Sequence, residues 1–524
     1  MEKTVDHKES VTSEVSEPDS HLVAKIKNAD VTLKFMEEHD AMVGELSPDQ
    51  EKALYRKLLR RVLVIVFVIN LLMFFDKNAM SFSKLLGMWK ETHLTQKQYS
   101  NVNSLFYAGY LVGQIPGHLI MQRVNLRLFM LAQLLCWVIL MFGQLAAKDY
   151  PAIAAIRFLL GVTESVVTPC IEHTLAMFFT LKEQEVINPI FWIGTVGVGI
   201  PTGFIAYGVN HYKGDVISRW KIYWIINGGL TLLLAIWVAF DYPDNPATYK
   251  AFSIEERVHI VRRIKKQSRS SIEEKHFKMY QFSEAIRDPI TWFFGLYAFT
   301  SMLANNMNFQ QQVISTSLGV SNLNSTLITV AQAGYSTVAF LIGSYLLSKF
   351  KNSLCYLSVI SNIPAIVGGI MAVALPWSNK IGILAGCIIV HTDGFAYILG
   401  LCWSQSSSAG YTKRLTRTTV FMIGYGVANI VAPQMWTTGP RYYAAWIVQL
   451  VVAWFFSSVL LIWIRVILSR RNKKRLAQLE FDDDGNIISK KNAFVEDGGE
   501  DRRKVDVSML DLTDLENEEF IYPL

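Results

Sequence analysis

Two ionisable side chains stand next to each other in a stretch that is otherwise apolar. Asp76 and Lys77 fall within "NLLMFFDKNAM", residues 70–80. A charge at the centre of a membrane helix costs about 2.5 to 3.5 kcal/mol on insertion scales, so it normally faces a cavity or an opposite charge. Such a pair could bind a charged solute or carry a proton. The alternative is an interfacial pair at a helix end, with the Lys77 ammonium reaching the membrane surface.

A second apolar stretch, "AIRFLLGVTESVVTP", also carries opposite charges. Its residues Arg157, Gly161, Glu164 and Thr168 follow one another at helical spacing and therefore share one face. Glu164 lies about 13 residues, roughly 20 Å, from the outer end of this helix, and Asp76 lies about as deep in its own. Both carboxylates are thus expected at middle depths. Glu164 could alternatively be a structural partner of Arg157 or of another buried cation.

Neutral polar side chains gather on two further apolar segments. Residues 305–312 alone hold six amide side chains, which is more than helix packing needs, so part of this segment should line a wet cavity. The two groups are Tyr107, Tyr110 and Gln114 on one helix face, followed by Pro116, and Asn305, Asn308 and Gln312 on another.

One more acid lies inside an apolar segment. Asp393 shares a helical face with Gly386, Tyr397 and Gly400, whereas His391 is expected to point elsewhere, as a packed or interfacial residue. A packing role and a cavity role are equally open for Asp393.

The elements that must position these residues are membrane-spanning helices. Hydrophobic residues make up 51% of the 524 residues and charged residues only 18%, and the charges gather in residues 1–61, in 241–288 and after 465. Crossing a bilayer takes about 20 apolar residues, and helices are the default because backbone amides cannot stay unpaired in lipid. The expected spans are 62–84, 101–122, 127–147, 151–173, 187–209, 220–240, 289–313, 325–349, 353–376, 380–402, 416–437 and 441–468.

This pattern predicts an all-α polytopic membrane protein with about 12 transmembrane helices. The expected parts are a polar N-terminal tail (1–61), six helices (62–240), a linker (241–288), six further helices (289–468) and a C-terminal tail (469–524). In the linker, Ser253-Ile254-Glu255-Glu256 is a capping-box pattern that opens an amphipathic helix. We expect this helix at the membrane surface, as a connector rather than a regulatory domain. "GVGIPTGF" in the fifth span indicates close helix packing.

Positive charges in short loops predict the orientation. The clusters lie an even number of spans apart, which places both termini and the linker in the cytoplasm. They are Arg56, Lys57, Arg60 and Arg61; Arg123 and Arg127; Lys413, Arg414 and Arg417; and Arg470, Arg471, Lys473 and Lys474. The net charge of +6 therefore reflects membrane orientation, and no nucleic-acid partner is expected. The five cysteines lack metal-ligand spacing, so no metal site is expected.

Five motifs taken together resemble a known family. They are "FFDK", "LFYAGYLVGQIPGHLIMQR", "RFLLGVTESVVTP", "YPDNPATYKAFSIEER" and "DLTDLENEEFIYPL". Over about residues 30–524 the chain resembles the major facilitator superfamily, and within it the fungal allantoate permease group of the anion:cation symporter family. The resemblance implies two six-helix bundles around a central site that is exposed alternately to each side.

The resemblance also implies roles for individual residues. Helices one, four, seven and ten line the site in this superfamily, and the residues selected above lie on all four. The basic residue of the first-helix pair meets a substrate carboxylate, and the fourth-helix glutamate takes part in proton coupling. These positions are Lys77 and Glu164 here. The family commonly has arginine in place of Lys77, and lysine is a point charge rather than a planar fork, which suits an amino acid as well as a simple carboxylate.

We therefore expect a secondary active transporter that couples proton movement to uptake of a small carboxylate-bearing nutrient, and not an enzyme. Cysteine is the first candidate that the resemblance suggests; allantoate, nicotinate, pantothenate or another organic anion stays open. Glu164 and Asp76 would handle the proton. Substrate binding is expected from Lys77, Tyr107, Gln114, Asn305, Asn308 and Gln312, with Arg157 and Asp393 as further cavity candidates.

The expected partners are the small-molecule substrate and the lipid bilayer, with the proton as coupling ion and no other cofactor. A monomer in the fungal plasma membrane is expected, and an internal membrane stays open. The alternative from another class is a nutrient sensor with a transporter fold, which would signal without net flux.

Overall fold

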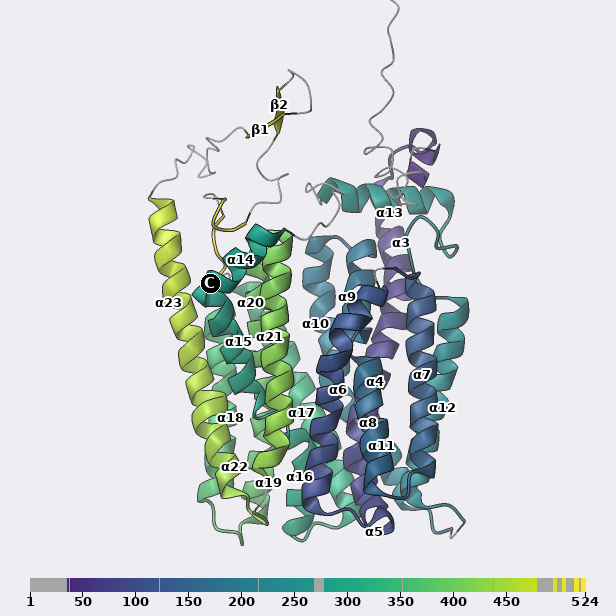
Figure 1. Cartoon of the computed structure of the whole chain (residues 1–524), viewed down its shortest axis with the longest axis vertical. Coiled ribbons are helices and arrows are strands. Elements are labelled where there is room, and N and C mark those ends of the chain that lie inside the picture. Colours follow the sequence, from purple (N-terminus) through teal and green to yellow (C-terminus); the bar gives the residue numbers. More distant parts are fainter. Residues whose placement is uncertain are drawn as a thin grey trace, which may run out of the picture.

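The structure of the protein is a computed structural model. It describes residues 35–36, 38–121, 123–214, 216–267, 278–350, 352–436, 438–477, 493–496, 502–505, 513–517 and 520–524. Figure 1 shows two groups of long helices that stand side by side with their axes roughly parallel.

The first group is formed by the N-terminal half of the chain. A capping box at Ser47 opens its first long helix, and Asp149 caps the helix that later carries the fourth-span charges. Its elements are η1 (Asp40–Met42), α3 (Pro48–Leu58), the π-helical η2 (Leu59–Leu63), α4 (Val64–Leu85), α5 (Met88–Thr92), α6 (Gln96–Met121), α7 (Leu126–Ala146), α8 (Tyr150–Glu164), α9 (Val167–Phe178), α10 (Leu181–Gly197), α11 (Gly199–Asn210) and α12 (Arg219–Phe240).

The second group follows two shorter helices, α13 (Ile254–Gln267) and α14 (Met279–Arg287). Its elements are α15 (Pro289–Met302), α16 (Met307–Ser317), α17 (Asn322–Lys349), α18 (Leu354–Ala374), α19 (Lys380–Ile389), η3 (Val390–Thr392), α20 (Asp393–Ser406), α21 (Tyr411–Val431), η4 (Ala432–Met435), α22 (Tyr443–Val448), the π-helical η5 (Gln449–Phe456) and α23 (Ser457–Leu476). Two four-residue strands, β1 (Ala493–Glu496) and β2 (Arg502–Val505), pair antiparallel beyond the helices.

Nine helical stretches of the described chain are long and apolar enough to cross a membrane. Three more polar segments, α6, the α15–α16 pair and α21, run alongside them (Figure 1). Together they make twelve, so the predicted all-α fold with about 12 membrane helices is confirmed. Two of these polar segments, α6 and the α15–α16 pair, carry the predicted tyrosine and amide stripes.

Each group of helices has its own apolar core. One large cluster of buried apolar side chains comes from residues 54–260 and another from residues 290–522. We refer to the two groups as the N-bundle and the C-bundle. The fold is therefore two helical bundles, and polar residues that lie where the bundles face each other are the natural candidates for a site.

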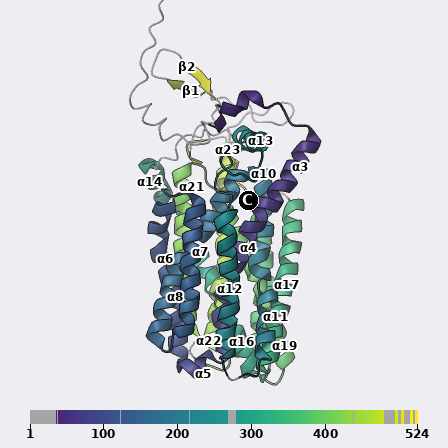
Figure 2. The ribbon, with the colours of Figure 1, turned by 90° about the vertical axis from the view of Figure 1, so that its right-hand side faces the viewer.

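Helix α13 lies across one end of the bundles, beside α3 and close to α14 in height (Figures 1 and 2). We call this the upper end, and the end that holds α5 and α22 the lower end. The predicted capping box at Ser253 is confirmed, because Ser253 and Glu256 exchange backbone-to-side-chain bonds of 2.8 and 3.2 Å. Ion pairs of Glu256 with Lys57 and of Arg263 with Glu183 fasten α13 to the N-bundle.

Several membrane helices are broken near their middle. The fourth breaks between α8 and α9, where Val166 leaves the helical backbone conformation, and the fifth breaks before Pro201, which has no amide hydrogen to donate. The seventh breaks between Met302 and Met307, and the tenth passes through the 3-10 turn η3. Broken membrane helices leave backbone groups that must face protein or a wet cavity, so the breaks point toward a central site.

Candidate functional site

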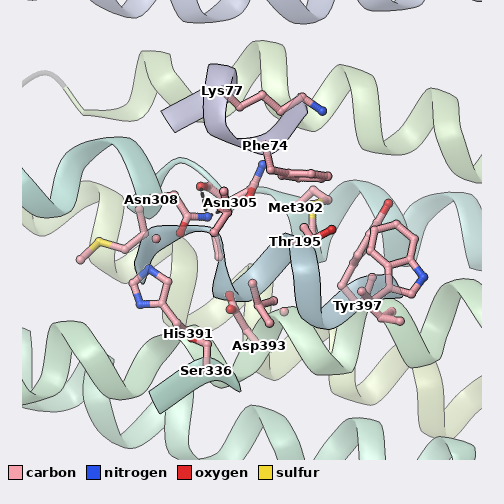
Figure 3. Close-up of a pocket in the computed structure, with 18 of the residues that line it drawn as sticks. Phe74, Lys77, Thr195, Met302, Asn305, Asn308, Ser336, His391, Asp393 and Tyr397 are labelled. Carbon is pink, nitrogen blue, oxygen red and sulfur yellow. Dashed lines mark hydrogen bonds between the residues drawn. The ribbon is translucent and has the colours of Figure 1, made fainter. Parts of the chain in front are cut away.

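A cavity of about 220 Å³ lies between the two bundles, which is room for a solute of amino-acid size. Both bundles contribute to its wall, through α4, α6, α9, α10 and α11 on one side and α15 to α17, α20 and α21 on the other. Among the residues that line it are Phe74, Lys77, Tyr107, Tyr110, Thr195, Asn305, Asn308, Gln332, Ser336, His391, Asp393, Tyr397 and Tyr425. Figure 3 shows Lys77 and Phe74 on one side of the cavity and His391, Asp393 and Ser336 on the opposite side.

Close contact between α6 and α8 fixes the position of the fourth-span charges. A methyl group on Gly161 would lie 1.9 Å from the carbonyl oxygen of Phe106, and one on Gly109 would lie 2.0 Å from that of Phe158. Only glycine allows the two backbones to approach so closely. The glycines in "RFLLGVTESVVTP" and "LFYAGYLVGQIPGHL" thus hold α8 and its charged residues rigidly against α6.

Four buried charges form a cluster between α4 and α8. The Lys77 ammonium lies 3.7 Å from Glu164 Oε2, and Arg157 Nη1 lies 3.9 Å from Asp76 Oδ2. All four side chains are buried, and both oxygens of Asp76 and of Glu164 have no hydrogen-bond partner among the described residues. The pairs are therefore close enough to attract but too long to be hydrogen bonds. We call this group of four the membrane cluster.

Only Lys77 of the membrane cluster lines the cavity. Its ammonium lies 4.4 Å from the centre of the Phe74 ring and 5.9 Å from the centres of the Phe106 and Tyr110 rings. Aromatic faces attract a cation that has given up water. Asp76, Arg157 and Glu164 sit behind Lys77, so a solute in the cavity would act on them through this one side chain.

The amide-rich segment meets the cavity where α15 ends and α16 begins. Asn305 donates to Asn429 at 2.6 Å and to Tyr107 at 3.4 Å, which joins the two bundles. Gln332 donates to Asn308 at 3.1 Å. Asn305, Asn308 and Tyr107 all line the cavity, as the sequence predicted for a wet surface.

Two predicted substrate-binding amides lie outside the cavity wall. Gln312 is buried, accepts from Ser81 at 3.0 Å and donates to Thr329 at 3.4 Å. Gln114 lies one turn beyond Tyr110 toward the upper end of α6 and does not line the cavity either. Gln312 lies on α16 one turn beyond Asn308, where its bonds to Ser81 and Thr329 hold it among the contacts between the bundles rather than in the cavity wall. Their binding roles stay predictions.

His391 lines the cavity together with Asp393, contrary to the expectation that it points elsewhere. That expectation assumed one regular helix, whereas η3 is a 3-10 turn with about three residues per turn. The tighter turn brings His391 round to the side that Asp393 occupies. Asp393 itself accepts a 3.0 Å bond from Trp454 Nε1.

Several lining residues were not selected from the sequence. Thr195 and Trp192 come from α10, Gln332 and Ser336 from α17, and Tyr425 from α21. They are uncharged and occur only one or two to a helix, so the sequence showed no polar group as conspicuous as the amide-rich segment. A ring contact at 5.9 Å between Tyr425 and Tyr107 closes the wall between the bundles.

The bundles are joined on the lower side of the cavity. Among the described residues, every hydrogen bond between the bundles lies level with the cavity or below it. These bonds join Ser81 to Gln312, Leu85 to Asn322, Gln96 to Trp436, Asn101 and Ser104 to Gln434, Ser104 to Ile430, and Tyr107 to Asn305. Gly199 and Gly203 add a close contact with α17, as the fifth-span motif predicted. The lower side is thus closed.

Comparisons with known proteins agree with this architecture. Residues 66–433 match the model of the Major Facilitator Superfamily. The chain is 44% identical to the high affinity cysteine transporter of Saccharomyces cerevisiae, over 97% of this chain and 98% of that protein. It is 27% identical to the allantoate permease of the same yeast, over 98% of this chain and 94% of that protein.

The fold comparison points the same way. The xylose transporter XylE from E. coli, in a partially occluded inward open conformation, matches 79% of this chain and 97% of its own with a TM-score of 0.58 at 11% identity. The chain belongs to the Major Facilitator Superfamily. It is a multi-pass membrane transporter and not an enzyme, and it works on a small-molecule substrate within a lipid bilayer.

Proposed function

We propose that this protein is a proton-coupled symporter of a small carboxylate-bearing nutrient. The observation that carries the proposal is the position of Lys77, which faces the cavity while its ammonium lies 3.7 Å from the buried carboxylate of Glu164. A substrate carboxylate and Glu164 would compete for one cation. Binding of the substrate would leave Glu164 with a weaker counter-charge in an apolar setting, which favours its protonated form.

Asp76 and Arg157 would complete this coupling. Arg157 lies 3.9 Å from Asp76, so the second pair keeps the cluster balanced when Lys77 turns to the substrate. Proton and substrate would then move together. A proton that crosses the membrane along the potential gains about 2.3 kcal/mol per 100 mV, enough to drive accumulation.

The remaining predicted site residues would shape the cavity for the substrate. Asn305, Asn308 and Tyr107 would supply neutral hydrogen bonds, and the bonds on the lower side would part to admit substrate from there. We assign the upper end to the cytoplasm, because the positive loop clusters lie at that end. A monomer in the plasma membrane is the form we propose.

Cysteine is the substrate we propose first. The support is the similarity, over almost the whole chain, to a protein described as a high affinity cysteine transporter. Allantoate, nicotinate, pantothenate and other organic anions are the alternatives. A nutrient sensor with this fold is the alternative from another class, and it would bind ligand without net flux.

The test is uptake of labelled cysteine in a yeast strain that lacks its own cysteine transporter, at acid and neutral outside pH. We expect uptake that rises at acid pH, falls with a protonophore and is displaced by unlabelled cysteine. Uptake without pH dependence would remove the proton coupling. If protein at the cell surface takes up no cysteine, the substrate must be sought among the other organic anions. If none of these anions is taken up either, the sensor is favoured.

A further inference from the structure

An acidic side chain faces the cavity from the C-bundle without a cation to balance it. Asp393 lines the cavity opposite Lys77 (Figure 3). None of the ion pairs between described residues includes Asp393, whereas Asp76 and Glu164 each have one. Trp454 Nε1, at 3.0 Å from Oδ2, orients the carboxylate but does not neutralise it.

A second acceptor lies beside this carboxylate. His391 is only 9% exposed, and its Nδ1 is 3.0 Å from the carbonyl oxygen of Cys387. A carbonyl oxygen can only accept, so Nδ1 carries the hydrogen and Nε2 of the neutral ring is an acceptor. Nε2 is buried and has no hydrogen-bond partner among the described residues. The C-bundle side of the cavity thus presents a carboxylate without a counter-charge and a ring nitrogen without a donor among the described residues.

We infer that Asp393 and His391 form a binding site for the ammonium group of the substrate. An ammonium carries three hydrogen-bond donors and one positive charge, which matches a carboxylate that lacks a cation and a ring nitrogen that lacks a donor. Because Lys77 faces them across the cavity, a zwitterion can place its carboxylate at the N-bundle and its amine at the C-bundle. The inference rests on the proposed function, and it narrows the substrate class to α-amino acids.

This arrangement selects against simple acids. A substrate with a carboxylate and no amine would satisfy Lys77 but would leave the Asp393 carboxylate without a counter-charge and the buried His391 Nε2 without a donor. A buried polar group that loses its partner costs far more than an exposed one. Sites built around such groups reject analogues that lack the matching donor. A bound zwitterion would also connect the two bundles, which closing around a substrate requires.

The experiment compares amino acids with the same acids lacking the amine, on the purified full-length protein in detergent. The pairs are cysteine with 3-mercaptopropionate and alanine with propionate, and the measurement is the rise in melting temperature at increasing ligand concentration. We expect stabilisation by cysteine and an at least about 10-fold weaker response to 3-mercaptopropionate. Three results would overturn the inference. An amino acid and its deaminated partner could stabilise the protein equally at the same concentration, only the deaminated acids could stabilise it, or none of the four compounds could.

Two variants sharpen the result. Asp393→Asn should weaken the response to cysteine at least about 10-fold and leave that to 3-mercaptopropionate unchanged or stronger, whereas Asp393→Glu, which keeps the charge, should restore part of the preference. A melting temperature close to that of the unaltered protein without ligand shows that each variant is folded. Equal weakening for both members of the pair would assign Asp393 a structural role and overturn the inference. Because binding is measured without a proton gradient, failure of proton coupling alone would leave this result unaffected.

Discussion

Two clusters of buried charges are built from the same residue types but differ in how completely their charged groups are hydrogen-bonded. The membrane cluster, Asp76, Lys77, Arg157 and Glu164, has ion pairs of 3.7 and 3.9 Å and carboxylate oxygens without hydrogen bonds. A second cluster, which we call the upper cluster, lies at the upper end of the C-bundle. Its members are Glu284, Asp288, Lys413, Arg417, Arg471 and Asp514.

The upper cluster is closely hydrogen-bonded. Asp288 accepts from Arg417 at 3.0 Å and from Arg471 at 2.8 Å, and it also caps α15 through the amide of Ile290. Lys413 reaches Glu284 at 2.7 Å and Asp514 at 2.9 Å. Asp288, Lys413 and Asp514 are buried, and so is Arg417. The cluster ties α14, α15, α21 and α23 to the C-terminal residues.

The difference separates structure from function. Buried charges with complete hydrogen bonding hold a single arrangement, because any movement would leave a buried charge unpaired, and an unpaired buried charge costs free energy. The membrane cluster lacks those bonds, so its cations can change partners at little cost. We therefore expect changes in the upper cluster to damage stability, and changes in the membrane cluster to damage coupling and binding while the fold survives.

The largest effect is expected from Asp288→Ala. Its removal takes the carboxylate away from two guanidinium groups, one of them fully buried, which should lower the free energy of unfolding by about 3–5 kcal/mol. Thermal unfolding in detergent measures it. Asp149→Ala is the matched control, because Asp149 caps α8 in the same way but is exposed, and it should cost about 0.5–2 kcal/mol. A loss no larger than that of the control would show that the upper cluster adds nothing beyond a helix cap.

The same residue predicts a pH dependence. Burial raises the pKa of Asp288, but the bond from Arg471 and the charges of Arg417, Arg471 and Lys413 outweigh it and hold the pKa below the usual 3.8. A depressed folded pKa gives stability that is complete above the unfolded pKa and is lost as the pH falls through the folded pKa. The stability gap between the unaltered protein and Asp288→Asn should therefore stay constant from neutral pH to about 5 and shrink below about 4. A gap that shrinks already between pH 7 and 5 would contradict this.

Glu164→Gln tests the membrane cluster, where we expect a loss of coupling without a loss of stability. It should abolish accumulation driven by the proton gradient, while exchange of labelled for unlabelled substrate and the melting temperature change little. Loss of one coupled charge at 100 mV forfeits about 2.3 kcal/mol, or roughly 50-fold in the accumulation ratio. Steady-state uptake in proteoliposomes measures it, with Glu172→Gln, an exposed acid on α9, as control. Unchanged accumulation would remove Glu164 from the coupling role.

Lys77→Ala should weaken binding rather than folding. Loss of a charge-assisted bond to the substrate carboxylate should raise the half-saturation concentration for uptake roughly 10- to 100-fold. Lys84→Ala is the matched control, since Lys84 lies two turns further along α4, 3.6 Å from the Trp89 ring, and does not line the cavity. Equal effects of the two variants would place the carboxylate anchor elsewhere.

The sequence was informative where the physical cause is local. Apolar length predicted the helices, and the cost of a charge in lipid pointed to Asp76, Lys77 and Glu164. Spacing on a helix placed Tyr107, Asn305 and Asn308 on a polar surface. These properties depend on neighbours in the chain, so they can be read without knowing how the helices pack.

What the sequence did not predict depends on contacts between distant segments. The 3-10 turn that brings His391 to the cavity and the bond that holds Gln312 against Ser81 of the N-bundle are set by packing between helices. Lys413 and Arg417 were read only as loop charges that set orientation, yet both are buried in the upper cluster. Their partners Asp514 and Asp288 each lie more than a hundred residues away, beyond any periodic pattern.

The smallest effect is expected from a change in the C-terminal tail, and it tests whether the upper cluster or the tail that packs on it supplies the stability. Tyr522→Phe removes the 2.8 Å bond that the hydroxyl donates to Asp514 and the 3.2 Å bond that it accepts from Arg475, and it should cost about 0.5–1.5 kcal/mol. The backbone of Tyr522 keeps both 2.9 Å bonds with Asn472, and Asp514 keeps Lys413, so the tail should stay docked and transport should be unchanged. Melting temperatures of this variant and of Asp288→Ala, compared in one detergent, give the answer. If Tyr522→Phe lowers the stability as much as Asp288→Ala does, the docked tail, rather than the buried ion pairs, holds the upper end together. The stability of the upper cluster, and its difference from the membrane cluster, would then come from the tail.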